Sequence, residues 1–203
     1  MTLSSDNLLQ SILDSLDRFE YISPGDIPDI ELYMDQVTTF MEDHLKSSRR
    51  YPEDKILTKT MINNYAKNDL LPPPVKKKYS KEHLLVMIFI YYFKSILSIT
   101  DIQSLLNPLT EKYFQCGKDF SLENIYNEVF QLEADQIEYL KKDIVERYNI
   151  SQSTFPDAPK EDQEFLKIFS FICLLSFDVY VKKQVIEKLV DSFPAPEDKN
   201  KKK

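Results

Sequence analysis

The sequence predicts an all-α protein. Its 203 residues include only two glycines, and apolar residues recur at i, i+3 and i+4 along most of the chain, which is the period of an amphipathic helix. No segment of useful length alternates apolar and polar residues as a half-buried strand does. With 42% apolar and 29% charged residues, the composition is that of a globular protein long enough to bury one core, or two small ones, without metal or disulfides.

Two helices are expected in the N-terminal part. The first spans about Ser5–Phe19 and ends ahead of the Ser-Pro-Gly breaker at 23–25. The second begins at Asp29, an N-cap residue that follows a proline, and its apolar face extends to Leu45. Residues 46–55 are polar and are expected to form a loop.

A short helix and an extended arm follow. Thr58 is expected to cap a helix that ends near Asn68, and Pro72–Lys78 must be extended because three consecutive prolines cannot continue a helix. Ser80 caps the next helix. Its Leu84–Phe93 run is apolar on every side, which predicts burial all round.

Three more helices are expected in the rest of the chain. Thr100 and Gln103 show a capping-box pattern that opens a short helix, and Pro108 is expected to end it. The longest helix is expected at Ser121–Tyr148, and the final one from Lys160 to about Phe193.

The basic residues are concentrated in one segment. The chain has a net charge of −7, yet Lys46–Lys81 holds ten basic and three acidic residues and so carries +7, which leaves −14 for the remainder. Such asymmetry is expected where one segment meets a polyanion.

The short helix combines an apolar anchor with a polar surface. About ten residues are marginal as an isolated helix, so Ile62, Leu70 and Leu71 are expected to pack on the preceding helix and on the Leu84–Phe93 run. Its exposed side chains would form a polar row made of Lys59, Thr60, Asn63, Asn64 and Lys67. Asparagine can pair with adenine in the major groove, and lysine and threonine can reach phosphate or guanine.

A family resemblance becomes visible at these residues. Leu57–Pro73, with its Leu-Leu-Pro-Pro junction, and the following Lys77–Leu84 segment resemble the MerR family of winged helix-turn-helix regulators. The resemblance covers about residues 32–106 and looks closest to the uncharacterised YkrK-like bacterial proteins. It implies a recognition helix at 58–68 in the major groove and a basic wing at 72–79 on the phosphate backbone.

Together, the sequence pattern and this resemblance predict an organisation in four parts. They are an N-terminal helix packed on the core (1–28), a MerR-like winged helix-turn-helix domain (29–110), a helical dimerisation or effector region (118–193) and a disordered basic tail (194–203).

Ten residues are candidate DNA contacts, and several have a structural alternative. They are Lys59, Thr60, Asn63, Asn64, Lys67, Lys76, Lys77, Lys78, Arg49 and Arg50. The three wing lysines could instead form only a soluble hairpin tip, and the two arginines could only solvate the long loop. Tyr65 and Tyr79 could reach the DNA backbone or pack between helix and wing.

No enzyme, metal or cofactor site is expected. The chain has no glycine-rich phosphate loop, nucleophile motif or His/Cys/carboxylate cluster, and Cys116 and Cys173 are not spaced as metal ligands. His44 and His83 are expected to be structural. The two most apolar runs have ten residues each, too few to cross a membrane, and the N-terminus lacks a signal segment, so a cytoplasmic protein is expected.

The sequence therefore predicts a DNA-binding transcriptional regulator whose partner is double-stranded DNA. A homodimer is expected through the apolar stripe of the 121–148 helix, although the same stripe can pack on the final helix, and both can hold. The alternative function is a helical protein–protein interaction module that keeps the winged scaffold without binding DNA. An effector ligand of unknown identity remains open.

Overall fold

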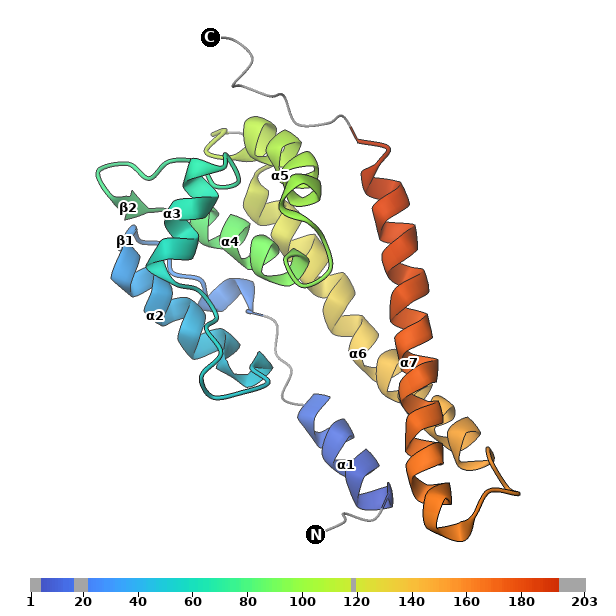
Figure 1. The fold of residues 1–203 in the computed structure, drawn as a ribbon. Coiled ribbons are helices and arrows are strands. Elements are labelled where there is room, and N and C mark those ends of the chain that lie inside the picture. Colours follow the sequence, from blue (N-terminus) through green and yellow to red (C-terminus); the bar gives the residue numbers. More distant parts are fainter. Residues whose placement is uncertain (1–4, 17–21, 118–119, 194–203) are drawn as a thin grey trace. The chain divides into compact units, whose positions relative to one another are not determined.

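The computed structural model of the chain describes residues 5–16, 22–117 and 120–193 (Figure 1). Seven α-helices and two short strands lie in these residues, which confirms the all-α class. The helices are α1 Ser5–Leu16, α2 Met34–Leu45, α3 Lys59–Lys67, α4 Lys81–Phe93, α5 Ile99–Tyr113, α6 Leu122–Gln152 and α7 Lys160–Val190. The strands are β1 Leu32–Tyr33 and β2 Lys78–Tyr79. None of these helices is long and apolar enough to span a membrane.

The chain forms two compact units. Unit I comprises residues 20–130 and 186–203, and unit II comprises residues 1–19 and 131–185. Helices α6 and α7 therefore contribute to both units. The predicted tail at 194–203 lies outside the described residues.

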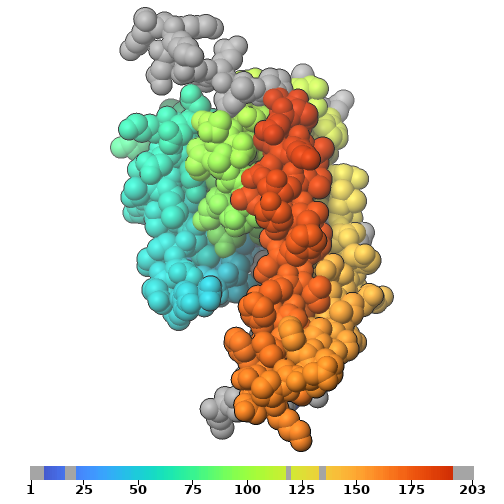
Figure 2. All heavy atoms as spheres, turned by 45° about the vertical axis from the view of Figure 1, so that its right-hand side comes forward, coloured from blue at the N-terminus to red at the C-terminus, as the bar shows by residue number. Residues whose placement is uncertain are grey.

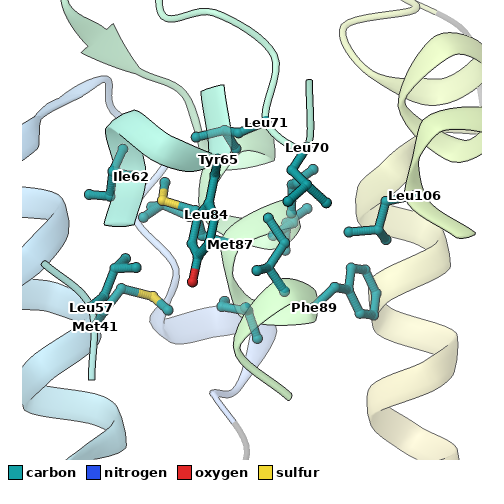
Figure 3. Close-up of a cluster of buried hydrophobic side chains, with 14 of the residues drawn as sticks. Met41, Leu57, Ile62, Tyr65, Leu70, Leu71, Leu84, Met87, Phe89 and Leu106 are labelled. Atoms are coloured by element: carbon teal, nitrogen blue, oxygen red, sulfur yellow. The ribbon is translucent and has the colours of Figure 1, made fainter. Parts of the chain in front are cut away.

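The core of unit I is built around α4. Every side chain from His83 to Ile90 is at most 8% exposed, so the predicted burial all round is confirmed for this part of the helix. Figure 3 shows Met41, Ile62, Tyr65 and Leu106 among the buried side chains around Leu84, Met87 and Phe89. Helices α2, α3 and α5 thus each supply part of the cover that α4 requires.

Helix α3 is capped and anchored as the sequence predicts. The Thr58 hydroxyl accepts a hydrogen bond from the Met61 backbone N–H at 3.1 Å. Ile62, Leu70 and Leu71 are at most 2% exposed. Asp69 has a φ of 53°, in the left-handed region that commonly ends a helix, and this turn directs the two leucines back into the core.

The predicted start of the second helix at Asp29 is wrong, as is the absence of strands. Helix α2 begins at Met34, where the Tyr33 backbone N–H donates to the Gln36 side-chain oxygen at 2.9 Å. The residues before it form β1, in which Leu32 pairs with Tyr79 and Tyr33 with Lys78. Two-residue strands are too short to show an alternating pattern, so sequence periodicity could not reveal them.

The predicted bounds of the helix around residue 106 are also wrong. Ser98, and not Thr100, is its N-cap, in a capping box with Asp101. Pro108 lies inside α5, which continues to Tyr113. Proline removes one backbone hydrogen bond, but Leu109 and Tyr113, which follow it, pack against the core, so the packing of the turns after Pro108 outweighs that loss.

In unit II, helices α6 and α7 pack against each other. The rings of Tyr148 and Phe171 meet edge to face at 5.5 Å, and Arg147 lies 3.5 Å from the Asp178 carboxylate. Helix α6 extends four residues beyond the expected Tyr148, to Gln152, and α7 ends at Val190, before the expected Phe193. The interpretation that the α6 stripe packs on the final helix is confirmed at Tyr148.

Replacing Leu70 with alanine tests the anchoring of α3. Leu70→Ala should lower the free energy of unfolding by about 2–5 kcal/mol, because it leaves a cavity beneath α3, as measured by urea denaturation. Val75→Ala is the control, because Val75 is 56% exposed and should change stability by less than about 0.5 kcal/mol. Equal effects of the two changes would show that Leu70 does not anchor the helix.

Candidate nucleic-acid interface

The polar row of α3 faces away from the core. Ile62 and Tyr65 point inward, at 0% and 7% exposure. All five members of the row are exposed, namely Lys59, Thr60, Asn63, Asn64 and Lys67. The helix therefore offers lysine, threonine and asparagine side chains on one surface, with nothing apolar between them.

The wing ends in a tight turn with two lysines at its tip. The Lys78 backbone N–H donates to the Val75 carbonyl at 2.9 Å, and Lys76 and Lys77 have φ angles of 50° and 65°. Positive φ at both central residues is the mark of a type I′ turn, where asparagine and glycine are the usual residues. Pairing of β1 with β2 attaches the base of this hairpin to the start of α2.

A groove brings the polar row and the wing together. Its volume is about 450 Å³, and its lining residues are Tyr33, Met34, Asp35, Asn63, Pro74, Lys77 and Tyr79. Asn63 comes from α3, whereas Lys77 comes from the wing. Two predicted contact residues that are distant in the sequence therefore line the same groove. Residues 33–35, at the end of β1 and the start of α2, also line it. No pattern in the sequence indicates a role for Tyr33, Met34 or Pro74.

Acidic residues from outside the basic segment neutralise part of its charge. Lys59 forms an ion pair with Asp35. Lys78 lies 3.7 Å from the Glu31 carboxylate and 5.7 Å from the centre of the Tyr33 ring. When residues 29–45 are included, five further acidic side chains reduce the net charge of the segment from +7 to +2.

The described residues contain no ion pair for Lys67, Lys76 or Lys77. Among the predicted contact residues, positive charge without an ion pair therefore lies at the tip of the wing, at the end of α3 and at Arg50 of the loop.

The two arginines of the 46–57 loop differ in their surroundings. Arg49 forms an ion pair with Glu42 of α2 and donates to the Pro52 carbonyl at 3.4 Å, so its guanidinium attaches the loop to α2. Arg50 is exposed, and its guanidinium lies 5.1 Å from the centre of the Tyr51 ring. These contacts favour the structural alternative for Arg49.

Tyr65 and Tyr79 are packing residues. They are 7% and 3% exposed, and burial raises the pKa of both phenol groups. Both belong to the buried core cluster, which supports the interpretation that they are packing residues.

His83 supports the base of the wing. Its Nδ1 accepts a hydrogen bond from the Ser80 backbone N–H at 2.9 Å, which closes a capping box at the start of α4. The ring meets Tyr79 edge to face at 5.5 Å. Burial lowers the pKa of His83, and the carbonyls of Pro72 and Pro73 partly oppose that shift. The expectation that His83 is structural is confirmed.

Among the residues that the structure describes, no three His, Cys, Asp or Glu side chains are grouped to hold a metal ion. Cys116 and Cys173 are free thiols.

Comparison with known proteins corrects the family assignment. A family model described as a domain of unknown function (DUF1836) matches residues 22–129, which include α2 to α5, the wing and the start of α6. Assignment to the MerR family from the Leu-Leu-Pro-Pro junction is therefore wrong. The Leu-Leu-Pro-Pro junction has a local structural role here. After α3 ends, Leu70 and Leu71 are buried in the core, and the prolines then keep the chain extended. No curated protein and no solved structure shows a significant match to the chain.

Protonation of His83 should destabilise the fold. The unfolded histidine takes up a proton near pH 6.5, whereas the folded one resists it because its pKa is lowered. The contribution of neutral His83 to the free energy of unfolding is therefore fully present above about pH 6.5 and is lost as the pH falls below that value. His83→Gln should remove this loss, because glutamine also closes a capping box and does not titrate.

The measurement is urea denaturation between pH 7.5 and 5. The control is His44→Gln, which also removes one histidine but keeps the buried imidazole of His83 and should therefore keep the loss of stability at low pH. Parallel pH profiles for the parent and His83→Gln would contradict the assignment.

Proposed function

The chain belongs to the DUF1836 family, and we propose that it binds double-stranded DNA sequence-specifically and regulates transcription. In this proposal α3 enters the major groove, and the wing at 72–79 lies along the phosphate backbone. The observation that carries the proposal is the groove of about 450 Å³ that Asn63 of α3 and Lys77 of the wing both line. An amide suited to base edges and an ammonium suited to phosphate are thereby available on one surface.

The size and chemistry of α3 suit the major groove. Its nine residues give a length of about 13–14 Å at 1.5 Å per residue, and the groove is about 12 Å wide. Asn63 and Asn64 can each form two hydrogen bonds with adenine. Because Ile62 and Tyr65 are buried, the helix can present these amides without exposing its apolar anchor.

The wing tip supports phosphate contact. Holding a residue other than glycine in the left-handed region costs about 1–2 kcal/mol, and Lys76 and Lys77 both adopt it. The two exposed lysines therefore project from one tight turn. If the two lysines served only solubility, this conformational cost would bring no benefit. If they bind phosphate, the turn benefits binding because it presents both lysines together.

Removing the two tip lysines tests the contact with the DNA backbone. Lys76→Ala/Lys77→Ala should weaken binding to all duplexes alike and lower the slope of log affinity against log salt by about two, one for each phosphate contact. Fluorescence anisotropy from 50 to 300 mM salt gives this slope. Lys142→Ala/Lys188→Ala removes the same charge from exposed positions elsewhere and should leave the slope unchanged.

An unchanged slope for the tip variant would remove the wing from the interface. If the parent protein shows no salt-dependent affinity for any duplex, the alternative of a protein–protein interaction module holds.

Replacing Asn63 tests base reading. With a cognate site defined by genomic footprinting, Asn63→Ala should reduce the preference for that site over a random duplex by about 1–3 kcal/mol, because a bidentate base contact is lost. The salt slope should stay nearly the same, since no charge is removed. Asn149→Ala, an exposed asparagine on α6, is the matched control. If Asn63→Ala and Asn64→Ala both retain the full preference, α3 is not the reading helix.

A further inference from the structure

The outward face of α7 carries a stripe of exposed apolar side chains. Phe165, Phe169, Ile172 and Tyr180 are 67%, 50%, 53% and 60% exposed. Intervals of four, three and eight residues keep them on one side of the helix. Figure 2 shows this orange and red helix at the surface of the molecule. All four residues belong to unit II.

The opposite face of α7 is already used within unit II. Phe171 is 7% exposed and packs on Tyr148. The Ser170 and Thr154 hydroxyls are 3.0 Å apart. Since this face meets α6, the outward stripe is a second apolar surface that the described residues of unit II leave exposed.

The area of the stripe suits a two-fold interface. An aromatic side chain has about 200 Å² of surface, so the exposed fractions of Phe165, Phe169 and Tyr180, together with Ile172 and Val179, amount to about 500 Å². That is near the upper end for the largest apolar patch on a monomer. Pairing the stripe with its copy would bury about 1,000 Å² in total, which reaches the size of a specific interface before the polar rim is added.

We propose that a second copy of this chain covers the stripe, with the two α7 helices antiparallel. Maximum overlap of the 165–180 stripe with itself places the two-fold axis between Ile172 and Cys173. The charges favour the antiparallel direction, because the first turn of α7 is acidic, with Glu161 and Asp162, whereas Lys183 lies near its other end beside Lys182, which is ion-paired with Asp178. A parallel pair would set like charges side by side.

Side-chain sizes fit the same register. Rotation about that axis brings Phe169 of one copy opposite Ser176 of the other, so that a large side chain meets a small one. Phe165 comes opposite Tyr180, and Asp162 opposite Lys183. This proposal places on α7 the dimer interface that the sequence predicts on the 121–148 helix. None of these residues belongs to the candidate nucleic-acid interface, so the dimer is tested without DNA.

The first experiment compares two phenylalanine-to-glutamate changes on α7 by sedimentation equilibrium of the full chain. Phe169→Glu should raise the dimer dissociation constant by about thirtyfold or more, because it places charge in the centre of the interface. Phe177→Glu is the matched control, since Phe177 is 69% exposed but lies about a quarter turn away from the stripe. A monomeric parent at 50 μM, or dissociation only by Phe177→Glu, would overturn the proposal.

The second experiment measures the direction of pairing and does not depend on how well Phe169→Glu folds. In a chain with Cys116→Ser and Cys173→Ser, Asp162→Cys and Lys183→Cys are made separately and then mixed under mild oxidation. An antiparallel pair should give the mixed disulfide between the two chains as the main product. Disulfides between identical chains as the main product would indicate parallel helices and overturn the proposed arrangement.

Discussion

Burial of α4 on every side is the constraint on which the rest of unit I depends. A helix without a polar face must be covered from all directions, and Met41, Ile62 and Leu106 belong to the same buried cluster as α4. Helix α3, with nine residues, is too short to be stable by itself. Its stability comes from the buried cluster that Ile62 and Tyr65 share with α2 and α4. The outward residues of α3 contribute little to this cluster, so the polar row can vary in sequence with little cost to stability.

The wing depends on the same core through its base. Tyr79 is buried, pairs with Leu32 across the two strands and touches the ring of His83. The hairpin is therefore fixed at the end that packs on α4, while Lys76 and Lys77 lie exposed at the tip. This arrangement holds two charges at a set position relative to α3, which a flexible loop would not do.

Local signals in the sequence predicted the parts of the fold that local forces decide. Thr58 caps α3 and Leu71 is buried, because a cap and an apolar pair act within a few residues. Pro108 is the opposite case. The local effect of proline predicted that the helix ends there, but α5 continues because the residues after Pro108 pack on the core. The site was harder to predict. The polar row of α3 is exposed as expected. Asp35 pairs with Lys59 of this row and Glu31 with Lys78 of the wing, and these acidic residues approach the lysines only through helix packing and strand pairing.

Helix α7 illustrates a further limit of sequence periodicity. Its apolar residues occupy more than one face, with Phe171 buried against α6 and Phe165 exposed, and a hydrophobic pattern alone does not separate the two. Burial in the structure separates them, because unit II has described helical segments from only α1, α6 and α7. Only α1 and α6 are therefore available within the unit to pack on α7, and Phe165, Phe169 and Tyr180 stay exposed. The acidic first turn of α7 and the lysines toward its other end make an antiparallel copy of the same helix a complementary partner for that face.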